Sequence, residues 1–163
     1  MAYPALRPTL AAVPPLVLLL LSLAAPARAE LGGPLASVEA DRGRLGARMT
    51  SHALGGYRRH DLTRANGGGV HELTNANGRV FAVTWNGPGK PDLRALLGPY
   101  FATFQAGSTG YGRAMHALRR PPQVSRPDLR IQTAGHMGWF RGVALIPSLA
   151  PAGFDAAALA VQP

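Results

Sequence analysis

The sequence contains no cysteine, and this absence excludes several kinds of site at once. Thiolate catalysis, cysteine-based metal centres, disulfides and a lipid anchor on an N-terminal cysteine all need that residue. A chain without disulfides must therefore draw its stability from a hydrophobic core. Lysine is nearly absent too, because Lys90 is the single lysine among 17 basic residues.

Acidic residues are also scarce, with 8 of them against 17 arginines and lysines, which gives a formal net charge of +9. Such a protein can meet anionic lipid, lipopolysaccharide, acidic polysaccharide or nucleic acid. The densest basic groups are only the pairs Arg58-Arg59 and Arg119-Arg120. No block of basic residues typical of nucleic-acid binding is present. We therefore expect a solvated basic surface and no nucleic-acid partner.

The chain lacks any hydrophobic run of the roughly 20 residues that a membrane-spanning helix requires. Its longest apolar run covers residues 16–23, follows Arg7, and is preceded directly by Pro14-Pro15. A small-residue motif, Ala27-Arg28-Ala29, comes next. This order is typical of a secretory signal peptide, with an uncleaved anchor as the alternative.

We accordingly expect residues 1–29 to be removed by cleavage after Ala29. Residues 30–163 would then form a single globular domain in the periplasm or outside the cell of a bacterium. Without the signal segment, the protein would have no stable membrane span.

The rest of the sequence predicts an α+β domain with an antiparallel sheet of about five strands. Asn77-Gly78 is a strong signal for a hairpin turn. The expected order is a short N-terminal helix, a three-strand meander, an amphipathic helix that covers one face of the sheet, a long loop and a C-terminal hairpin. In residues, these elements are Val38–Leu45 with Ser37 as its cap, Tyr57–Thr63, Val70–Thr74, Arg79–Trp85, Pro91–Phe104, Gly107–Asp128, Leu129–Thr133 and Trp139–Ile146.

Two local patterns give finer expectations. Strict alternation places Phe81, Val83 and Trp85 on one face of their strand. Pro99 lies inside the apolar stripe of the main helix and removes a backbone donor, which predicts a kink or two abutting short helices. Beyond Ala150 we expect at most a short helix.

Several short sequence motifs are distinctive in combination. They include Leu31-Gly32-Gly33, Val80-Phe81-Ala82-Val83-Thr84-Trp85, Pro91-Asp92-Leu93-Arg94 and the turn Gly135-His136-Met137. With these motifs the chain resembles a family of short exported bacterial proteins that is known as a domain of unknown function. The resemblance implies export, but it brings no activity, cofactor or catalytic residue with it.

Catalytic signatures are missing from the sequence. None of the serines lies in the Gly-x-Ser-x-Gly elbow of hydrolases. His60 and Asp61 are adjacent on an expected strand, so their side chains point to opposite faces and cannot form a base and its orienting acid. We predict no catalytic residue and no cofactor, and a periplasmic hydrolase-type enzyme remains the alternative.

Metal binding has little support, because the five histidines include no pair four residues apart. The pairs Met115-His116 and His136-Met137 combine a thioether with an imidazole, which suits Cu(I). His116, His136 and Met137 are therefore weak candidate ligands for a minor copper site.

A binding surface has more support. Trp139 and Phe140 are consecutive on an expected strand, so one of them should face outward, and Arg141 shares the face of Trp139. Trp139, Arg141 and His136 form the candidate interaction surface. We expect a non-catalytic exported module that binds an envelope protein or an anionic or saccharide ligand.

Overall fold

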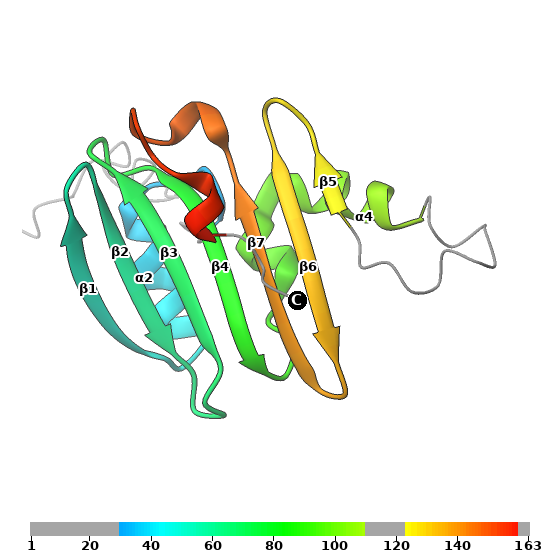
Figure 1. Cartoon of the computed structure of the whole chain (residues 1–163). Helices are drawn as coiled ribbons and strands as arrows, with labels where there is room; N and C mark the ends of the chain where they lie inside the picture. Colours follow the sequence, from blue (N-terminus) through cyan, green and yellow to red (C-terminus); the bar gives the residue numbers. More distant parts are fainter. Residues whose placement is uncertain (1–29, 110–122, 160–163) are drawn as a thin grey trace, which may run out of the picture.

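One antiparallel sheet of seven strands forms the centre of the computed structural model, which describes residues 30–109 and 123–159. The strands lie in the spatial order β1-β2-β3-β4-β7-β6-β5, so the chain completes a four-strand meander before it adds the remaining strands beyond β4 (Figure 1). Their bounds are β1 Arg48–Leu54, β2 Tyr57–Thr63, β3 Gly69–Asn75, β4 Val80–Pro88, β5 Gln123–Ser125, β6 Arg130–His136 and β7 Trp139–Leu145.

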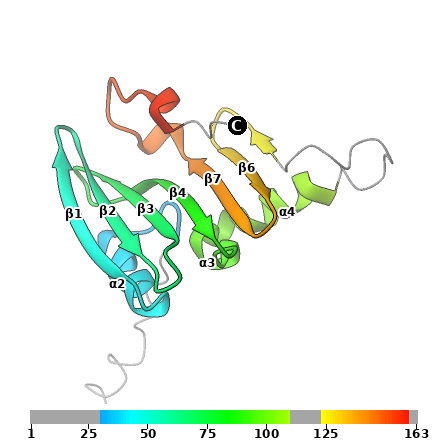
Figure 2. The same cartoon turned by 60° about the horizontal axis from the view of Figure 1, so that its bottom comes forward.

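The α-helices of the described residues all lie on one side of this sheet, which we call the helix-covered face (Figures 1 and 2). They are α2 (Leu35–Arg44), α3 (Leu93–Leu97) and α4 (Phe101–Thr109), with a 3₁₀ turn, η2 (Gly98–Tyr100), between the last two. The main hydrophobic core fills the space between helices and sheet, and Val83, Trp85, Leu96, Leu97 and Ile131 are among its members. Because the chain has no disulfide, burial of this apolar layer is the main source of its stability.

The opposite side, which we call the open face, is covered by the described residues only at one end. There the C-terminal segment, with the 3₁₀ turns η4 (Pro147–Leu149) and η5 (Ala156–Leu159), packs on a second small cluster. Its aromatic members Tyr57, Phe81 and Phe154 meet edge to face, with ring centroids 4.9–5.9 Å apart. The remainder of the open face carries mostly polar side chains.

The predicted α+β class with an antiparallel sheet is confirmed, but the expectation of about five strands is wrong. The two additional strands are β1, which makes the meander four-stranded, and the three-residue β5. Both lie at the edges of the sheet, and both lack an alternating apolar pattern. In β1 every residue except Met49 is exposed. Edge strands with so little burial leave almost no hydrophobic periodicity in the sequence.

The expected common face of Phe81, Val83 and Trp85 is also wrong. Leu73 pairs with Ala82 whereas Thr74 pairs with Val80, so Phe81 is the extra residue of a β-bulge. A bulge shifts the alternation of side chains by one position. Phe81 therefore points into the small cluster on the open face, while Val83 and Trp85 point into the main core.

The helices differ from the sequence expectation in their ends. The first begins at Leu35 after Pro34, and Ser37 is buried and hydrogen-bonded to the Pro34 carbonyl instead of capping the helix. The main helix is divided into α3, η2 and α4 at Pro99, as its proline predicts, and Asp92 caps α3 by accepting from the Ala95 amide at 3.2 Å. The expected loop Gly107–Asp128 is regular in part, because α4 extends to Thr109 and β5 takes Gln123–Ser125.

The expected signal peptide and the middle of that loop fall in residues 1–29 and 110–122, which lie outside the described residues. The domain boundary at residue 30 and the site of export therefore stay predictions. In the part of the chain that the structure describes, no helix is long and apolar enough to cross a membrane.

Candidate functional site

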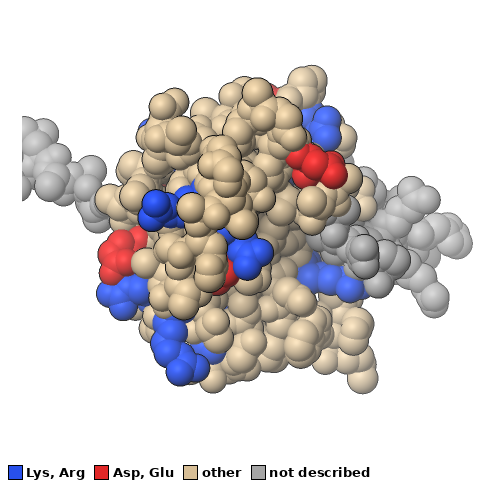
Figure 3. All heavy atoms as spheres, turned by 60° about the vertical axis from the view of Figure 1, so that its left-hand side comes forward, with Lys and Arg blue, Asp and Glu red and all other residues tan. Residues whose placement is uncertain are grey.

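The open face is basic over the area that the C-terminal segment leaves uncovered. Strand register places four arginines but a single carboxylate, that of Asp61, on this side of the described strands. The arginines are Arg48, Arg59, Arg130 and Arg141. Figure 3, turned to bring the β1 side forward, shows separate basic groups with few acidic ones, not one continuous block.

Asp61 is the centre of a charged network on β1, β2 and β3. The Arg59 Nε and Nη2 atoms donate to its Oδ2 at 3.2 and 3.0 Å, and His71 Nδ1 contacts its Oδ1. His52 Nε2 lies 3.6 Å from Oδ2. Burial by itself would raise the pKa of Asp61, but the hydrogen bonds from Arg59 and His71 outweigh it and lower that pKa below its ordinary value. The carboxylate is therefore ionised and accepts only, so His71 Nδ1 carries its proton toward Asp61.

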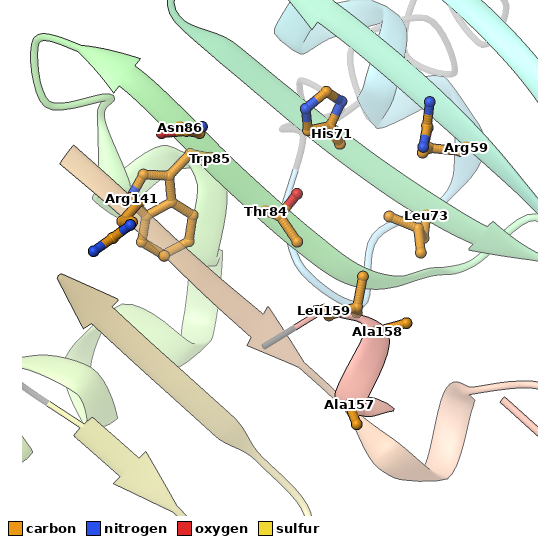
Figure 4. A pocket seen from close by; sticks show the side chains of 11 residues that line it. Arg59, His71, Leu73, Thr84, Trp85, Asn86, Arg141, Ala157, Ala158 and Leu159 are labelled. Carbon is orange, nitrogen blue, oxygen red and sulfur yellow. The ribbon is translucent and has the colours of Figure 1, made fainter. Parts of the chain in front are cut away.

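A shallow hollow of about 530 Å³ lies beside this network, between the strands and the C-terminal segment (Figure 4). Arg59 and Arg141 lie on opposite sides of it, with His71 and Thr84 between them. The hollow is lined by Arg59, His71, Leu73, Thr84, Trp85, Asn86, Arg141, Gly142, Ala157, Ala158 and Leu159. Two arginines thus frame a set of hydrogen-bonding groups, with an apolar wall from the C-terminal turn.

The candidate surface residues Trp139, Arg141 and His136 all lie on the open face. His136 is the register partner of Trp139 across the β6–β7 hairpin, and Arg141 follows two residues after Trp139 on the same side. Trp139 is 44% exposed, and its indole N–H donates to Asn86 Oδ1 at 2.7 Å, which fixes the ring. Arg141 lies opposite Asn86 and makes no ion pair with any described residue. Among the described residues, its guanidinium is thus the cation of the hollow that has no carboxylate partner.

His60 and Asp61 do point to opposite faces, as their adjacency in a strand requires. His60 lies on the helix-covered face, where Nδ1 is 2.8 Å from Ser51 Oγ and Nε2 is 3.1 Å from Thr74 Oγ1. Burial, with a smaller contribution from Arg58, lowers the pKa of His60 below its ordinary value, so the ring is neutral. Ser51 and His60 make a hydroxyl–imidazole contact, but a hydroxyl occupies the place where a triad has its acid.

The structure describes two of the three weak copper candidates. His116 lies outside them, and Met137 is fully exposed at the β6–β7 turn, where His136 precedes it. Within residues 30–109 and 123–159, no three histidine or acidic side chains are arranged to hold one metal ion.

Sequence reasoning missed Arg59, Asp61, His71, Thr84 and Asn86 as members of the site. Their proximity depends on strand register, since Asp61 pairs with His71 and His71 with Thr84 in one row across three strands. The turn signal Asn66-Gly67 between β2 and β3 could have indicated this pairing. It does not fix the register.

Comparisons with known proteins agree with the family resemblance in the sequence. No curated protein and no solved structure is significantly similar to the chain. A family model described as "Protein of unknown function (DUF2844)" matches residues 27–159. This match covers nearly all of the sequence after the expected signal peptide. The chain therefore belongs to the DUF2844 family of proteins of unknown function.

Proposed function

We propose that this protein is a non-catalytic exported binding module that holds an anionic saccharide on the open face of its sheet. The observation that supports this function best is the pair Arg59 and Arg141 on opposite sides of the hollow (Figure 4). A surface hollow with a few convergent polar groups is the usual form of a ligand site.

The charge of the hollow favours an anion. The Asp61 carboxylate is already paired with the Arg59 guanidinium, so it adds little repulsion. Arg141 has no acidic partner among the described residues, and a planar guanidinium matches a carboxylate with two parallel hydrogen bonds. A carboxylate-bearing ligand would supply the missing partner.

The neutral groups favour a saccharide. Thr84 and Asn86 offer hydroxyl and amide groups to sugar hydroxyls, and Asn86 holds the exposed Trp139 ring beside them. An aromatic ring with one apolar face and a satisfied N–H suits the C–H face of a sugar. Acidic sugars combine the two chemistries that the hollow presents.

This function is tested by calorimetry of the processed protein, residues 30–163, with an oligogalacturonate and with a neutral oligosaccharide of equal length. We expect binding of the acidic ligand only. Arg141→Ala should weaken it by about tenfold to a hundredfold, because a hydrogen-bonded charge pair is lost. Arg58→Ala is the matched control, since Arg58 lies on the helix-covered side of β2 and should leave the affinity unchanged.

Equal binding of both oligosaccharides would contradict the anionic part of the proposal. Absence of binding to either, together with recovery of one envelope protein in a pull-down, would replace the saccharide by a protein partner.

Export is tested by the N-terminus of the protein isolated from bacterial cells. We expect mass spectrometry of the periplasmic or secreted fraction to find a chain that begins at Glu30, after cleavage behind Ala29. A chain that retains residues 1–29 and stays in the membrane fraction would contradict export as a free domain.

A hydrolase is the second candidate, favoured by the Asp61–His71 pair. A carboxylate that orients a histidine through Nδ1, with Nε2 left available, is the arrangement of a general base. Turnover of an acyl or glycosyl substrate that is abolished by His71→Gln would establish this activity. We rank it second because Trp139 is exposed and no activated nucleophile lies beside His71 among the described hydrogen bonds.

A further inference from the structure

The turn of the β6–β7 hairpin presents an apolar residue to solvent in an unusual way. Met137 is fully exposed, and it has a φ of +39°, the single positive φ of a non-glycine residue in the described chain. Left-handed backbone is disfavoured for a residue with a long side chain, and Asn or Gly is the common choice there. Backbone strain of this kind gathers at functional sites. Neither side-chain packing nor backbone preference therefore explains a methionine at this position.

This turn is supported by two neighbouring loops at the same end of the sheet (Figure 1). The Gly89 amide donates to the Gly138 carbonyl at 3.0 Å. Arg64 Nη2 donates to the carbonyls of Pro88 and Gly89, each at 2.9 Å, and so ties the β2–β3 loop to the same segment. Hydrogen bonds therefore connect the three loops to one another, and they fix the position of the β6–β7 turn.

Trp139 adds a second exposed apolar side chain next to this turn. The described residues include four large apolar side chains that are exposed, and Met137 and Trp139 are two of them, on one hairpin. Lys90 is exposed on the adjoining loop, and Arg141 follows Trp139 on the open face. We call Met137, Gly138, Trp139 and Lys90 the tip. Met137 at the turn and Trp139 beside it on the open face give the tip two exposed apolar side chains, with basic residues next to them.

We propose that the tip docks the protein on a bilayer that contains anionic phospholipid, with Met137 and Trp139 entering the interfacial layer. A bilayer is preferred to a protein groove because the tip is a convex turn, and because a tryptophan beside basic residues matches the polar–apolar boundary of a membrane. Two side chains give weak, reversible attachment, which needs the attraction of Lys90 and Arg141 for the lipid headgroups. Docking would hold the open face close to the envelope.

The test uses the processed protein and vesicles of phosphatidylcholine with or without phosphatidylglycerol. We expect salt-sensitive co-sedimentation with the anionic vesicles alone. Met137→Asn should weaken it by about tenfold, because the apolar insertion is lost. Asn tolerates left-handed backbone, so the thermal midpoint of this variant should be unchanged or higher. Leu35→Asn is the matched control, since Leu35 is also an exposed apolar residue but lies on α2, and it should bind as the wild type does.

Tryptophan fluorescence gives a second readout. Trp85 is buried and Trp139 is exposed, so brominated lipid should quench the Trp139 component only, and Met137→Asn should reduce the quenching. Binding that persists unchanged in Met137→Asn, or no binding to anionic vesicles at low salt, would overturn the proposal. Met137→Asn should leave oligogalacturonate binding intact, which separates failure of tip docking from failure of the saccharide site.

Discussion

At about pH 9, Glu72→Gln should be about 3 kcal/mol more stable than the wild type, whereas at about pH 4 the two should have equal stability. Glu72 is 1% exposed on the helix-covered face of β3, between its register partners His60 and Val83. Neither of its carboxyl oxygens has a hydrogen-bond partner among the described residues. Burial raises the pKa of Glu72 to about 7, against an opposing effect of Arg44 on α2.

The direction of the pH dependence follows from the sign of this shift. The folded protein holds the Glu72 proton more tightly than the unfolded chain, so stability is highest below the ordinary pKa of 4.5 and is lost as the pH rises through about 7. One pKa unit is worth about 1.4 kcal/mol, and the displacement from 4.5 to about 7 gives the size of the loss. A glutamine side chain at this position has no proton to lose and therefore escapes the loss.

Urea unfolding of both proteins across this pH range measures the difference directly. Glu39→Gln is the matched control, because Glu39 is exposed on α2 and pairs with Arg42, and its substitution should change stability little at any pH. His60 and Asp61 titrate in the wild type and in both variants, and their pKa shifts favour the fold at higher pH, so the comparison cancels them. A constant difference between Glu72→Gln and the wild type would show that Glu72 is charged and satisfied in the fold.

Gly142→Ala should destabilise the protein by about 3 kcal/mol and lower its thermal midpoint by roughly 10 °C. Gly142 on β7 lies opposite Trp85 on β4, and the indole occupies the space where a side chain would stand. An alanine Cβ would lie 2.2 Å from Trp85 Cζ2 and 2.8 Å from the Gln132 carbonyl oxygen. Trp85 is 3% exposed within the main core, so its ring has little room to move away.

A double-mutant cycle shows whether the indole causes this loss. In the Gly142→Ala background, Trp85→Phe should reduce the free energy of unfolding by less than it does in the wild type, because the smaller ring relieves the contact.

Gly43→Ala is the matched control, and it should change the free energy of unfolding in the opposite direction. Gly43 lies inside α2, and an alanine Cβ at this position would meet no atom within 4 Å, so the substitution should stabilise the helix by about 0.5–1 kcal/mol. Additive effects of the two core substitutions would contradict steric contact as the cause.

The sequence predicts those elements of the fold whose burial repeats regularly. β2, β4 and β7 follow alternating or apolar patterns, and the hairpin signal Asn77-Gly78 lies at the β3–β4 turn. β1 could not be predicted, because an exposed edge strand needs no apolar face. The bulge at Phe81 could not be predicted, because the sequence alternates in the same way before and after one inserted residue.

The candidate site is less predictable than the fold. Trp139 and Arg141 share a face through simple alternation within one strand, and that relation is visible in the sequence. Asp61 and His71 meet through the register of a hairpin, which local residue types do not fix. Glu72 looks in the sequence like an ordinary charged residue of a strand. In the fold it is buried on the helix-covered face, and its electrostatic partner Arg44 comes from α2, an earlier part of the chain.

The central claim, that the open face binds an anionic saccharide, is tested most directly by nuclear magnetic resonance of the ¹⁵N-labelled processed protein during titration with oligogalacturonate. We predict saturable shifts of the amide signals of His71, Thr84, Asn86 and Arg141, no shifts on α2, and none with a neutral oligosaccharide. Shifts confined to the helix-covered face, or equal responses to both oligosaccharides, would contradict the account.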